Sequence, residues 1–362
     1  MSTADSASVV AGLPRVEVGE TILKVTDLRK HFPVKKPGII RLPDDPVKAV
    51  DGITLEVRRG QTLGLVGESG CGKSTAGRTM LKLLEPTSGT IEFAGTDITH
   101  AEGRELRLLR RQMQMVFQDP YGSLNPRHSI GKIIASPFEI QKVKPTGGVK
   151  AAVQELMERV GLNPEHYNRY PHEFSGGQRQ RIGVARAIAL RPQLVVCDEP
   201  VSALDVSIQA QVVNLLEDIQ AEQQMAYVFI AHDLSVVRHI SDRVVVMYLG
   251  KIMENADRDT LYEAPRHPYT KALLSAVPVP DPAYTARVDR IRLQGDLPSP
   301  ANPPSGCVFR TRCWKAQDRC ASEVPPLVEL APGHQVACHF PEPALEGVSF
   351  VPTIDDGEPT VA

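Results

Sequence analysis

Short apolar runs alternate with amphipathic stretches along the first 250 residues. Ile53, Leu55 and Val57 alternate with polar neighbours, the pattern of a strand with one buried face. Further strands are predicted where apolar residues follow one another, at 23–28, 63–66, 194–197, 227–230 and 244–248. Helices are predicted over 73–84 and 179–190, and at the i, i+3, i+4, i+7 patterns of 153–160 and 212–219. This alternation predicts an α/β fold, with a mostly parallel sheet covered by helices on both faces.

The composition changes after about residue 260, where proline becomes frequent and four of the six cysteines follow. We therefore expect a main domain over 21–258 and a smaller C-terminal extension over 259–344. The two ends, 1–20 and 345–362, are rich in small, polar and acidic residues and are predicted to be disordered tails.

Length and charge restrict the function. A chain of 362 residues can hold two domains. Its formal net charge of −2 gives no basic footprint for nucleic acid, and none for direct adsorption to anionic lipid. No apolar run reaches the length of a membrane span, and residues 1–20 lack the pattern of a secretory signal. We expect a cytosolic protein that reaches a membrane only through protein partners.

A glycine-rich loop joins the predicted strand 63–66 to the helix that begins at Lys73. Its residues, with the one that follows, are Gly67, Glu68, Ser69, Gly70, Cys71, Gly72, Lys73, Ser74 and Thr75. Glycines let backbone N–H groups turn toward phosphate oxygens, and the helix N-terminus adds partial positive charge. We expect Lys73 to neutralise the β- and γ-phosphates and Ser74 to hold Mg²⁺. A chance glycine-rich turn is the alternative, and the strand–loop–helix context argues against it.

Two carboxylates, Asp198 and Glu199, follow the apolar strand 194–197. We expect Asp198 to meet Mg²⁺ directly or through water, and Glu199 to polarise the attacking water. Such general-base assistance contributes about 10²–10⁴ in rate. The alternative is a helix cap, because Pro200 comes next, but the phosphate loop on the same predicted sheet favours the catalytic roles.

A second glycine-bearing motif, Phe174-Ser175-Gly176-Gly177-Gln178, precedes the helix predicted at 179–190. Ser175 and Gln178 fit a capping box, so a purely structural role is one interpretation. However, glycine in a helix costs about 0.5–1 kcal/mol relative to alanine, and two glycines are explained if a bulky anion approaches the backbone. Since the chain already has one phosphate loop, we expect this second cradle to face a nucleotide held by another subunit.

With these motifs, residues 22–255 resemble an ATP-binding subunit of an ABC transporter. The resemblance implies a P-loop NTPase fold, the ABC nucleotide-binding domain, with an antiparallel β subdomain and a helical subdomain at about 122–190. It also implies that two such subunits stack head to tail around two ATP molecules. Every motif residue is present, so hydrolysis is expected rather than a degenerate half-site.

The same resemblance assigns four further residues. Gln118 resembles the Q-loop glutamine, which senses Mg²⁺ and couples to the membrane partner. Asp205 is the last residue of 202–205, a stretch that resembles the D-loop. His232 resembles the switch histidine that contacts the γ-phosphate. Phe32 is the candidate for stacking on adenine, in place of the more usual tyrosine.

Three stretches resemble the oligopeptide and dipeptide importers within this family: 118–127, 267–274 and the cysteine-bearing end at 306–307 and 336–339. The implied partners are a paralogous ATP-binding subunit in a heterodimer, two transmembrane permease subunits and, indirectly, an extracellular peptide-binding protein. The implied location is the cytoplasmic face of the membrane. Nickel importers share much of this pattern. One alternative is a soluble ABC ATPase of DNA repair or translation, but such proteins carry coiled-coil insertions or two cassettes, and this sequence has neither. Another alternative is a cluster-based redox sensor.

The cysteines of the extension are Cys307, Cys313, Cys320 and Cys338. A cytosolic protein has little use for structural disulfides, so four thiolates in a proline-rich module suggest a metal. The close cysteine pairs of structural zinc sites are absent, whereas iron–sulfur ligation tolerates varied spacing. The resemblance implies a [4Fe-4S] cluster here, with zinc or free thiols as alternatives. Cys71 and Cys197 are expected to be packing residues.

Overall fold

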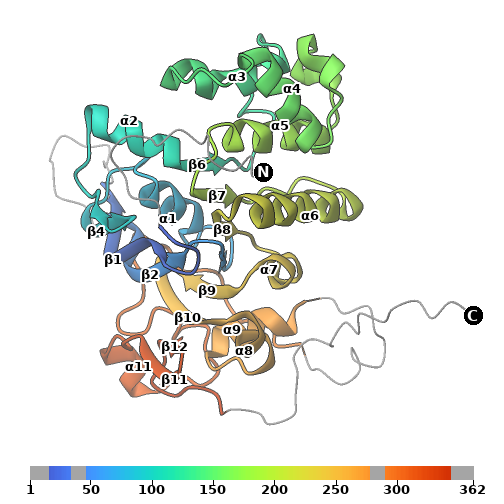
Figure 1. The fold of residues 1–362 in the computed structure, drawn as a ribbon. Coiled ribbons are helices and arrows are strands. Elements are labelled where there is room, and N and C mark those ends of the chain that lie inside the picture. Colours follow the sequence, from blue (N-terminus) through green and yellow to red (C-terminus); the bar gives the residue numbers. More distant parts are fainter. Residues whose placement is uncertain (1–15, 34–45, 278–289, 344–362) are drawn as a thin grey trace, which may run out of the picture. The chain divides into compact units, whose positions relative to one another are not determined.

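The computed structural model describes residues 16–33, 46–277 and 290–343 (Figure 1). The chain divides into two compact units that interleave along the sequence. The first unit comprises Met1–Lys30, Gly52–Leu63 and Ser74–Ile230, and the second comprises His31–Asp51, Gly64–Lys73 and Ala231–Ala362. In the described ranges, no helix is both long and apolar enough to cross a membrane.

Residues 16–20, which the sequence assigned to an N-terminal tail, make contacts within the first unit. The chain is already ordered at Val16, which is buried and whose carbonyl accepts a hydrogen bond from the Arg59 guanidinium. The Gly19 N–H donates to the Arg59 carbonyl over 2.9 Å. These contacts join 16–20 to the end of a strand far along the chain, which composition does not reveal. The remainder of the predicted N-terminal tail and all of 345–362 lie outside the described residues.

One sheet of the first unit is antiparallel. It has the order β2 (Val47–Arg58), β1 (Thr21–Phe32), β4 (Ser88–Phe93) and β5 (Thr96–Asp97). Ile53, Leu55 and Val57 of β2 are buried and their polar neighbours are not, as the alternation predicted. In contrast, β4 reads as Ser-Gly-Thr-Ile-Glu-Phe, and its sparse apolar residues gave no strand signal.

A parallel sheet forms the centre of the first unit. Its strands β6 (Met113–Val116), β7 (Leu194–Asp198) and β8 (Ala226–Ile230) pair in that order, with Asp198 opposite Ile230. Helix α1 (Lys73–Met80) approaches this sheet closely, since a Cβ at Gly77 would lie 2.8 Å from Ile230 Cδ1. Helix α6 (Val206–Gln223) is tied to β8 by the Tyr227 hydroxyl, which donates to the Leu216 carbonyl over 3.1 Å.

Helix α1 is shorter than the predicted 73–84. After Met80 the chain turns through Lys82, which has the left-handed φ of +53°, and the Leu83 N–H donates to the carbonyl of Arg78, five residues back. The buried Lys82 ammonium donates to the Thr99 carbonyl over 2.6 Å and pairs with Glu85. The helix therefore ends where Lys82 is anchored by tertiary contacts, four residues before the predicted end at Leu84.

A helical layer completes the first unit (Figure 1). It contains α3 (Ile130–Gln141), α4 (Val149–Arg159) and α5 (Gly176–Ile188). A further helix, α2 (Gly103–Gln112), precedes them in the chain. Val153 and Met157 of α4 are buried, as the helical periodicity predicted. The short turns η1 (Pro164–Asn168) and η2 (Pro171–Glu173) lead into α5.

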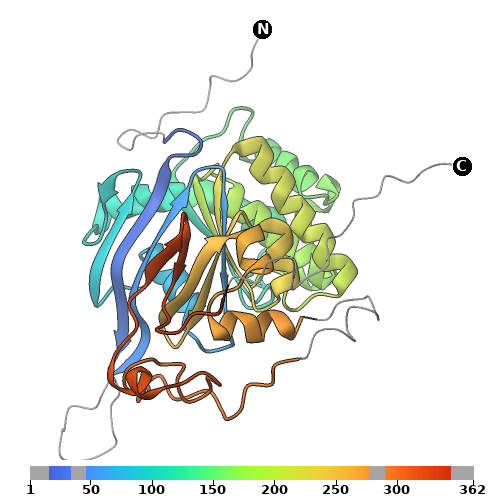
Figure 2. The same ribbon diagram turned by 90° about the horizontal axis from the view of Figure 1, so that it is seen from below.

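The second unit is built on an antiparallel sheet of β9 (Arg243–Tyr248), β10 (Lys251–Asp257), β12 (His334–Val336) and β11 (Val328–Ala331). Strand β12 runs beside β10, with Glu254 opposite Val336, and β11 pairs with β12 (Figure 2). The helices described in this unit are α7 (Leu234–Ile240), α8 (Arg258–Glu263), α9 (Pro268–Ser275) and α11 (Asp318–Ser322). The extension thus continues the sheet that begins in the main domain.

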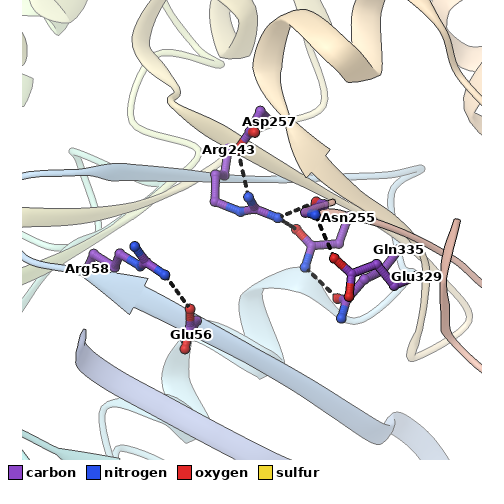
Figure 3. A network of polar contacts seen from close by, with 8 residues as sticks. Glu56, Arg58, Arg243, Asn255, Asp257, Glu329 and Gln335 are labelled. Atoms are coloured by element: carbon purple, nitrogen blue, oxygen red, sulfur yellow. Dashed lines mark hydrogen bonds and ion pairs between the residues drawn. The ribbon is translucent and has the colours of Figure 1, made fainter. Parts of the chain in front are cut away.

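A polar network fixes this continuation (Figure 3). Arg243 donates to Asp257 Oδ1 over 2.6 Å and to Asn255 Oδ1 over 3.2 Å, and it reaches the Gly333 carbonyl between β11 and β12 over 2.8 Å. Asn255 in turn donates to Gln335 Oε1 over 3.0 Å. Hydrogen bonds between residues 80 or more positions apart therefore hold the C-terminal hairpin against β10. In the first unit, Arg58 and Glu56 form a separate surface pair, 3.2 Å apart.

Candidate functional site

The glycine-rich loop lies between β3 (Thr62–Val66) and α1. A Cβ at Gly67 would lie 2.2 Å from the Met247 carbonyl oxygen, and one at Gly72 would lie 1.9 Å from the Ala49 carbonyl oxygen. Both glycines also have positive φ, so no other residue fits either position without moving the backbone. The buried Lys73 ammonium donates to the carbonyls of Gly67 and Glu68 over 2.7 and 3.1 Å. The lysine is therefore folded back over the loop that precedes it.

Ser74 begins the part of α1 that belongs to the first unit. Its hydroxyl donates to Asp198 Oδ1 over 2.6 Å, and Arg78 lies 3.3 Å from Asp198 Oδ2. Asp198 ends β7 and is fully buried. A hydroxyl and a carboxylate side by side are hard oxygen ligands of the kind that Mg²⁺ takes in proteins. Thr75 follows Ser74 in the same helix.

Glu199 faces Gln118. The Gln118 amide donates to Glu199 Oε2 over 2.8 Å, which brings together residues 81 positions apart. Glu199 has the left-handed φ of +46°, while its N–H donates to the Ile230 carbonyl over 2.9 Å. A non-glycine residue in this region is strained by about 1–3 kcal/mol, and such strain concentrates at functional sites. The backbone turn after β7 therefore aims the carboxylate away from the strand and toward the glutamine.

Sequence reasoning missed Arg78, which pairs with Asp198. The signal was present, because Arg78 stands four residues after Ser74 and so lies on the same face of the helix. This guanidinium offsets the charge of a carboxylate that has no exposure to water.

His232 and Phe32 belong to the second unit, whereas Glu199 belongs to the first. His232 is exposed and lies just before Asp233, which caps α7 by accepting from the Ser235 N–H over 2.8 Å. Phe32 ends β1 and is 36% exposed. Asp205 is exposed at the start of α6, where its side chain makes no capping hydrogen bond. The nucleotide roles of these three residues stay predictions.

The second glycine motif forms the capping box that was the structural alternative. Ser175 Oγ accepts from the Gln178 N–H over 3.3 Å, and Gln178 Oε1 accepts from the Ser175 N–H over 3.0 Å. A Cβ at Gly177 would lie 2.5 Å from Ile208 Cγ2, so packing against α6 also requires this glycine. Gly176 is different, because a Cβ there would meet Leu204 only at an ordinary 3.5 Å. The argument from anion approach therefore applies to Gly176 and is unnecessary for Gly177.

The four C-terminal cysteines share one module of the second unit. Cys307 and Cys320 are buried, and the Cys307 N–H donates to the Cys320 carbonyl over 2.8 Å. Burial raises the pKa of Cys307, of Cys313 and of Cys338, the last to about 11, so these three thiols are neutral at pH 7. Within the ranges that the structure describes, no group of three or more His, Cys, Asp and Glu side chains is arranged to hold a metal ion. The arrangement therefore gives the predicted [4Fe-4S] cluster no support.

The remaining two cysteines are buried, as expected of packing residues. Burial raises the pKa of Cys71, whose sulfur lies 3.8 Å from Lys73 Nζ, and burial also raises the pKa of Cys197 in β7. Neither thiol is therefore a ready nucleophile.

Comparison with known proteins identifies the family. The chain is 56% identical over 322 residues to the oligopeptide transport ATP-binding protein AppF of Bacillus subtilis, covering 89% of this chain and 98% of that protein. It belongs to the ABC transporter family. The description "ABC transporter" matches residues 50–202, and "Oligopeptide/dipeptide transporter, C-terminal region" matches residues 253–320.

A second relative is the "Probable peptide ABC transporter ATP-binding protein y4tS" of Sinorhizobium fredii. It is 52% identical over 327 residues, covering 90% of this chain and 92% of that protein. Among solved structures, the ATP-binding cassette MJ0796, in a dimeric post-hydrolysis state with ADP and Pi, matches with a TM-score of 0.58. That match covers 66% of this chain and 99% of the cassette at 24% identity, so it supports the P-loop α/β fold alone. The expected fold class is confirmed to that extent, and the family makes this chain an ATPase.

Proposed function

We propose that this chain hydrolyses ATP to energise the import of di- and oligopeptides through a membrane ABC transporter. The observation that carries the proposal is the paired contact of Ser74 with Asp198 and of Gln118 with Glu199, found in a chain with 52–56% identity to oligopeptide and peptide transport ATP-binding proteins. One pair provides oxygen ligands and the other provides a positioned carboxylate. Both are what phosphoryl transfer to water needs.

Within this proposal, the loop N–H groups of 67–74 and the Lys73 ammonium hold the phosphates of ATP. Ser74, Asp198 and Gln118 would hold Mg²⁺, which neutralises phosphate charge when bound. Glu199 takes the proton of the attacking water, and the Gln118 amide that contacts it holds the carboxylate in place. His232 contacts the γ-phosphate and Phe32 stacks on adenine.

The remaining motif faces outward to a partner. Ser175, Gln178 and Asp205 are all exposed, and Val206 beside them is 82% exposed. We infer that this surface completes the nucleotide site of a second, paralogous ATP-binding subunit in a head-to-tail heterodimer. The assembly would sit peripherally on the cytoplasmic face of two permease subunits, fed by an extracellular peptide-binding protein, with no role for nucleic acid.

The [4Fe-4S] assignment stays a separate part of the proposal. It rests on the sequence alone, which has four cysteines in this segment and basic residues among them: Arg310, Arg312, Lys315 and Arg319. Ligation would require the protonated thiols to ionise and the sulfurs to converge. Iron and labile sulfide should be quantified in anaerobically purified protein, with zinc measured in the same samples. Colourless, iron-free protein would remove this assignment and leave the ATPase proposal intact.

The test of the ATPase proposal is Glu199→Gln. This change keeps the shape of the side chain and its contact with Gln118 but removes the base, so we expect ATP to bind while turnover falls by at least about 10²-fold. Nucleotide binding, phosphate release and ATP-dependent dimerisation should be measured together. Glu222→Gln, an exposed change on α6 of the same unit, is the matched control. Normal phosphate release from Glu199→Gln would remove this residue from its assigned role.

A further inference from the structure

An arginine of the cysteine module contacts the phosphate loop. Arg312 directly precedes Cys313, and its two terminal nitrogens donate to Glu68 Oε2 over 2.5 Å and to Glu68 Oε1 over 3.1 Å. The two residues are 244 positions apart, yet both belong to the second unit. The Arg312 side chain is 9% exposed and that of Glu68 is 29% exposed, so the pair is largely shielded from solvent. A two-pronged arginine–carboxylate pair fixes orientation as well as charge.

A second group holds the backbone of the same residue. The Tyr269 hydroxyl, from α9, accepts a hydrogen bond from the Glu68 N–H over 2.8 Å. The Tyr269 ring packs against Tyr248 and Phe309, with centroids 4.8 and 5.3 Å away. Phe309 belongs to the cysteine module, and its carbonyl accepts from the Arg312 N–H over 3.0 Å. The extension therefore holds Glu68 by its side chain and by its main chain.

Charge gives this contact a consequence for nucleotide binding. Glu68 stands directly after Gly67 in a loop that would receive the phosphates of ATP. An unpaired carboxylate there would repel an anionic ligand, and the Arg312 guanidinium cancels that charge. The Arg312 nitrogens and the Tyr269 hydroxyl also fix the first residue after a glycine that has φ of +150°. A loop fixed in this way loses less conformational entropy when it binds its ligand.

We propose that Arg312 is a positioning residue for ATP, which holds the phosphate loop through Glu68 and makes nucleotide affinity depend on the C-terminal cysteine module. The inference rests on the proposed function, because it takes residues 67–74 as the ATP site. Arg312 itself acts through Glu68.

The test measures the Kd for Mg-ATP and kcat on the full-length chain. Arg312→Gln should weaken ATP binding by about 5-fold, equivalent to about 1 kcal/mol, with little change in kcat at saturating ATP. Arg312→Lys keeps the charge without the two-pronged contact and should lie between that variant and wild type. Arg310→Gln is the matched control, because Arg310 belongs to the same module but donates to Ser305. It should stay within about 2-fold of wild type.

A double-mutant cycle separates the charge effect from general damage to the fold. When Glu68→Gln is already present, adding Arg312→Gln should change the Kd by less than about 2-fold, because no carboxylate is left unpaired. The inference would be overturned if Arg312→Gln had the same Kd for Mg-ATP as Arg310→Gln. It would also be overturned if Arg312→Gln raised the Kd equally in the presence and absence of Glu68→Gln. If Arg312→Gln does not fold, Arg312→Lys in both backgrounds decides the same question.

Lys73→Ala distinguishes this inference from the proposed function. Loss of ATP binding in Lys73→Ala, with no effect of Arg312→Gln, would refute only the role of Arg312. Wild-type protein that binds no ATP, or binds it no better than Lys73→Ala, would refute the function itself.

Discussion

His267 makes the second unit sensitive to acid. Its ring is fully buried, and its Nδ1 accepts a hydrogen bond from the Tyr269 N–H over 3.0 Å at the start of α9. Burial lowers the pKa of His267 from 6.5 to about 4, although the Glu254 carboxylate and a backbone hydrogen bond at Ala337 partly oppose the shift. The neutral ring is therefore the form that caps the helix, and a proton on Nδ1 would remove that cap.

The sign and size of the effect follow from linkage. Between pH 6.5 and 4 the unfolded chain binds a proton at this histidine and the folded chain does not, so stability falls as the pH is lowered. The contribution is complete above pH 6.5 and is lost as the pH approaches 4. A shift of about 2.5 pH units corresponds to about 3 kcal/mol at 1.36 kcal/mol per unit.

Urea unfolding followed by Trp314 fluorescence measures this effect. Trp314 is the only tryptophan of the chain and belongs to the second unit, so its signal reports on the unit that contains His267. In His267→Asn the variant side chain can still cap α9 but does not titrate. Between pH 7 and pH 4 the unfolding free energy of wild type should therefore fall by about 3 kcal/mol more than that of this variant.

Subtracting the variant from wild type at each pH cancels the titration of groups that do not interact with His267. His239→Asn, an exposed position on α7 of the same unit, is the control for the change of residue type and should give the smaller dependence on pH. A His267→Asn difference as flat as that of His239→Asn would refute the assignment of a buried, neutral ring.

Two further predictions concern the first unit. Asp198→Asn removes the buried charge that accepts from Ser74, so Mg²⁺-dependent phosphate release should fall by at least about 100-fold. Titration of the variant with Mg²⁺ would check this, and full activity at saturating Mg²⁺ would contradict it. Gly177→Ala places a methyl group against Ile208 and should lower the unfolding free energy by about 1–3 kcal/mol. Adding Ile208→Ala should recover part of that loss in thermal unfolding, and no recovery would exclude the packing explanation.

The strands that the sequence predicted are those in which buried apolar residues follow one another without a break. β7 and β8 are buried along their whole length, and the predicted runs match them to within one residue. β10 was missed because Glu254 stands in the middle of it, although this carboxylate is fully buried. It is tolerated because it accepts from the Arg266 and His267 N–H groups and pairs with His334 over 2.7 Å, and His334 lies 80 residues further along the chain. No local pattern contains that information.

In the candidate site, too, some residues could be predicted from local sequence and others depend on contacts with distant parts of the chain. Ser74, Asp198 and Glu199 were predicted because a phosphate loop and the end of a parallel strand require particular residue types at particular places, whereas Gln118 was predicted only from the family resemblance. The contacts made by Arg312 and Tyr269 with Glu68 were not predictable, since they depend on how an extension with no helical or strand periodicity packs on the loop.

Residues 175–178 show why a structural and a functional interpretation of one motif do not exclude each other. The capping box of Ser175 and Gln178 satisfies two N–H groups at the start of α5, and Gly177 lets this helix pack against α6. These contacts hold the helix N-terminus in one position while its serine hydroxyl and first amides remain at the surface. The Ser175 hydroxyl accepts from the Gln178 N–H and can at the same time donate its own proton to a partner's phosphate, so the box can stay closed when phosphate binds. Gln178→Ala should therefore destabilise α5 without weakening ATP-dependent pairing to the same degree, whereas Ser175→Ala should weaken both.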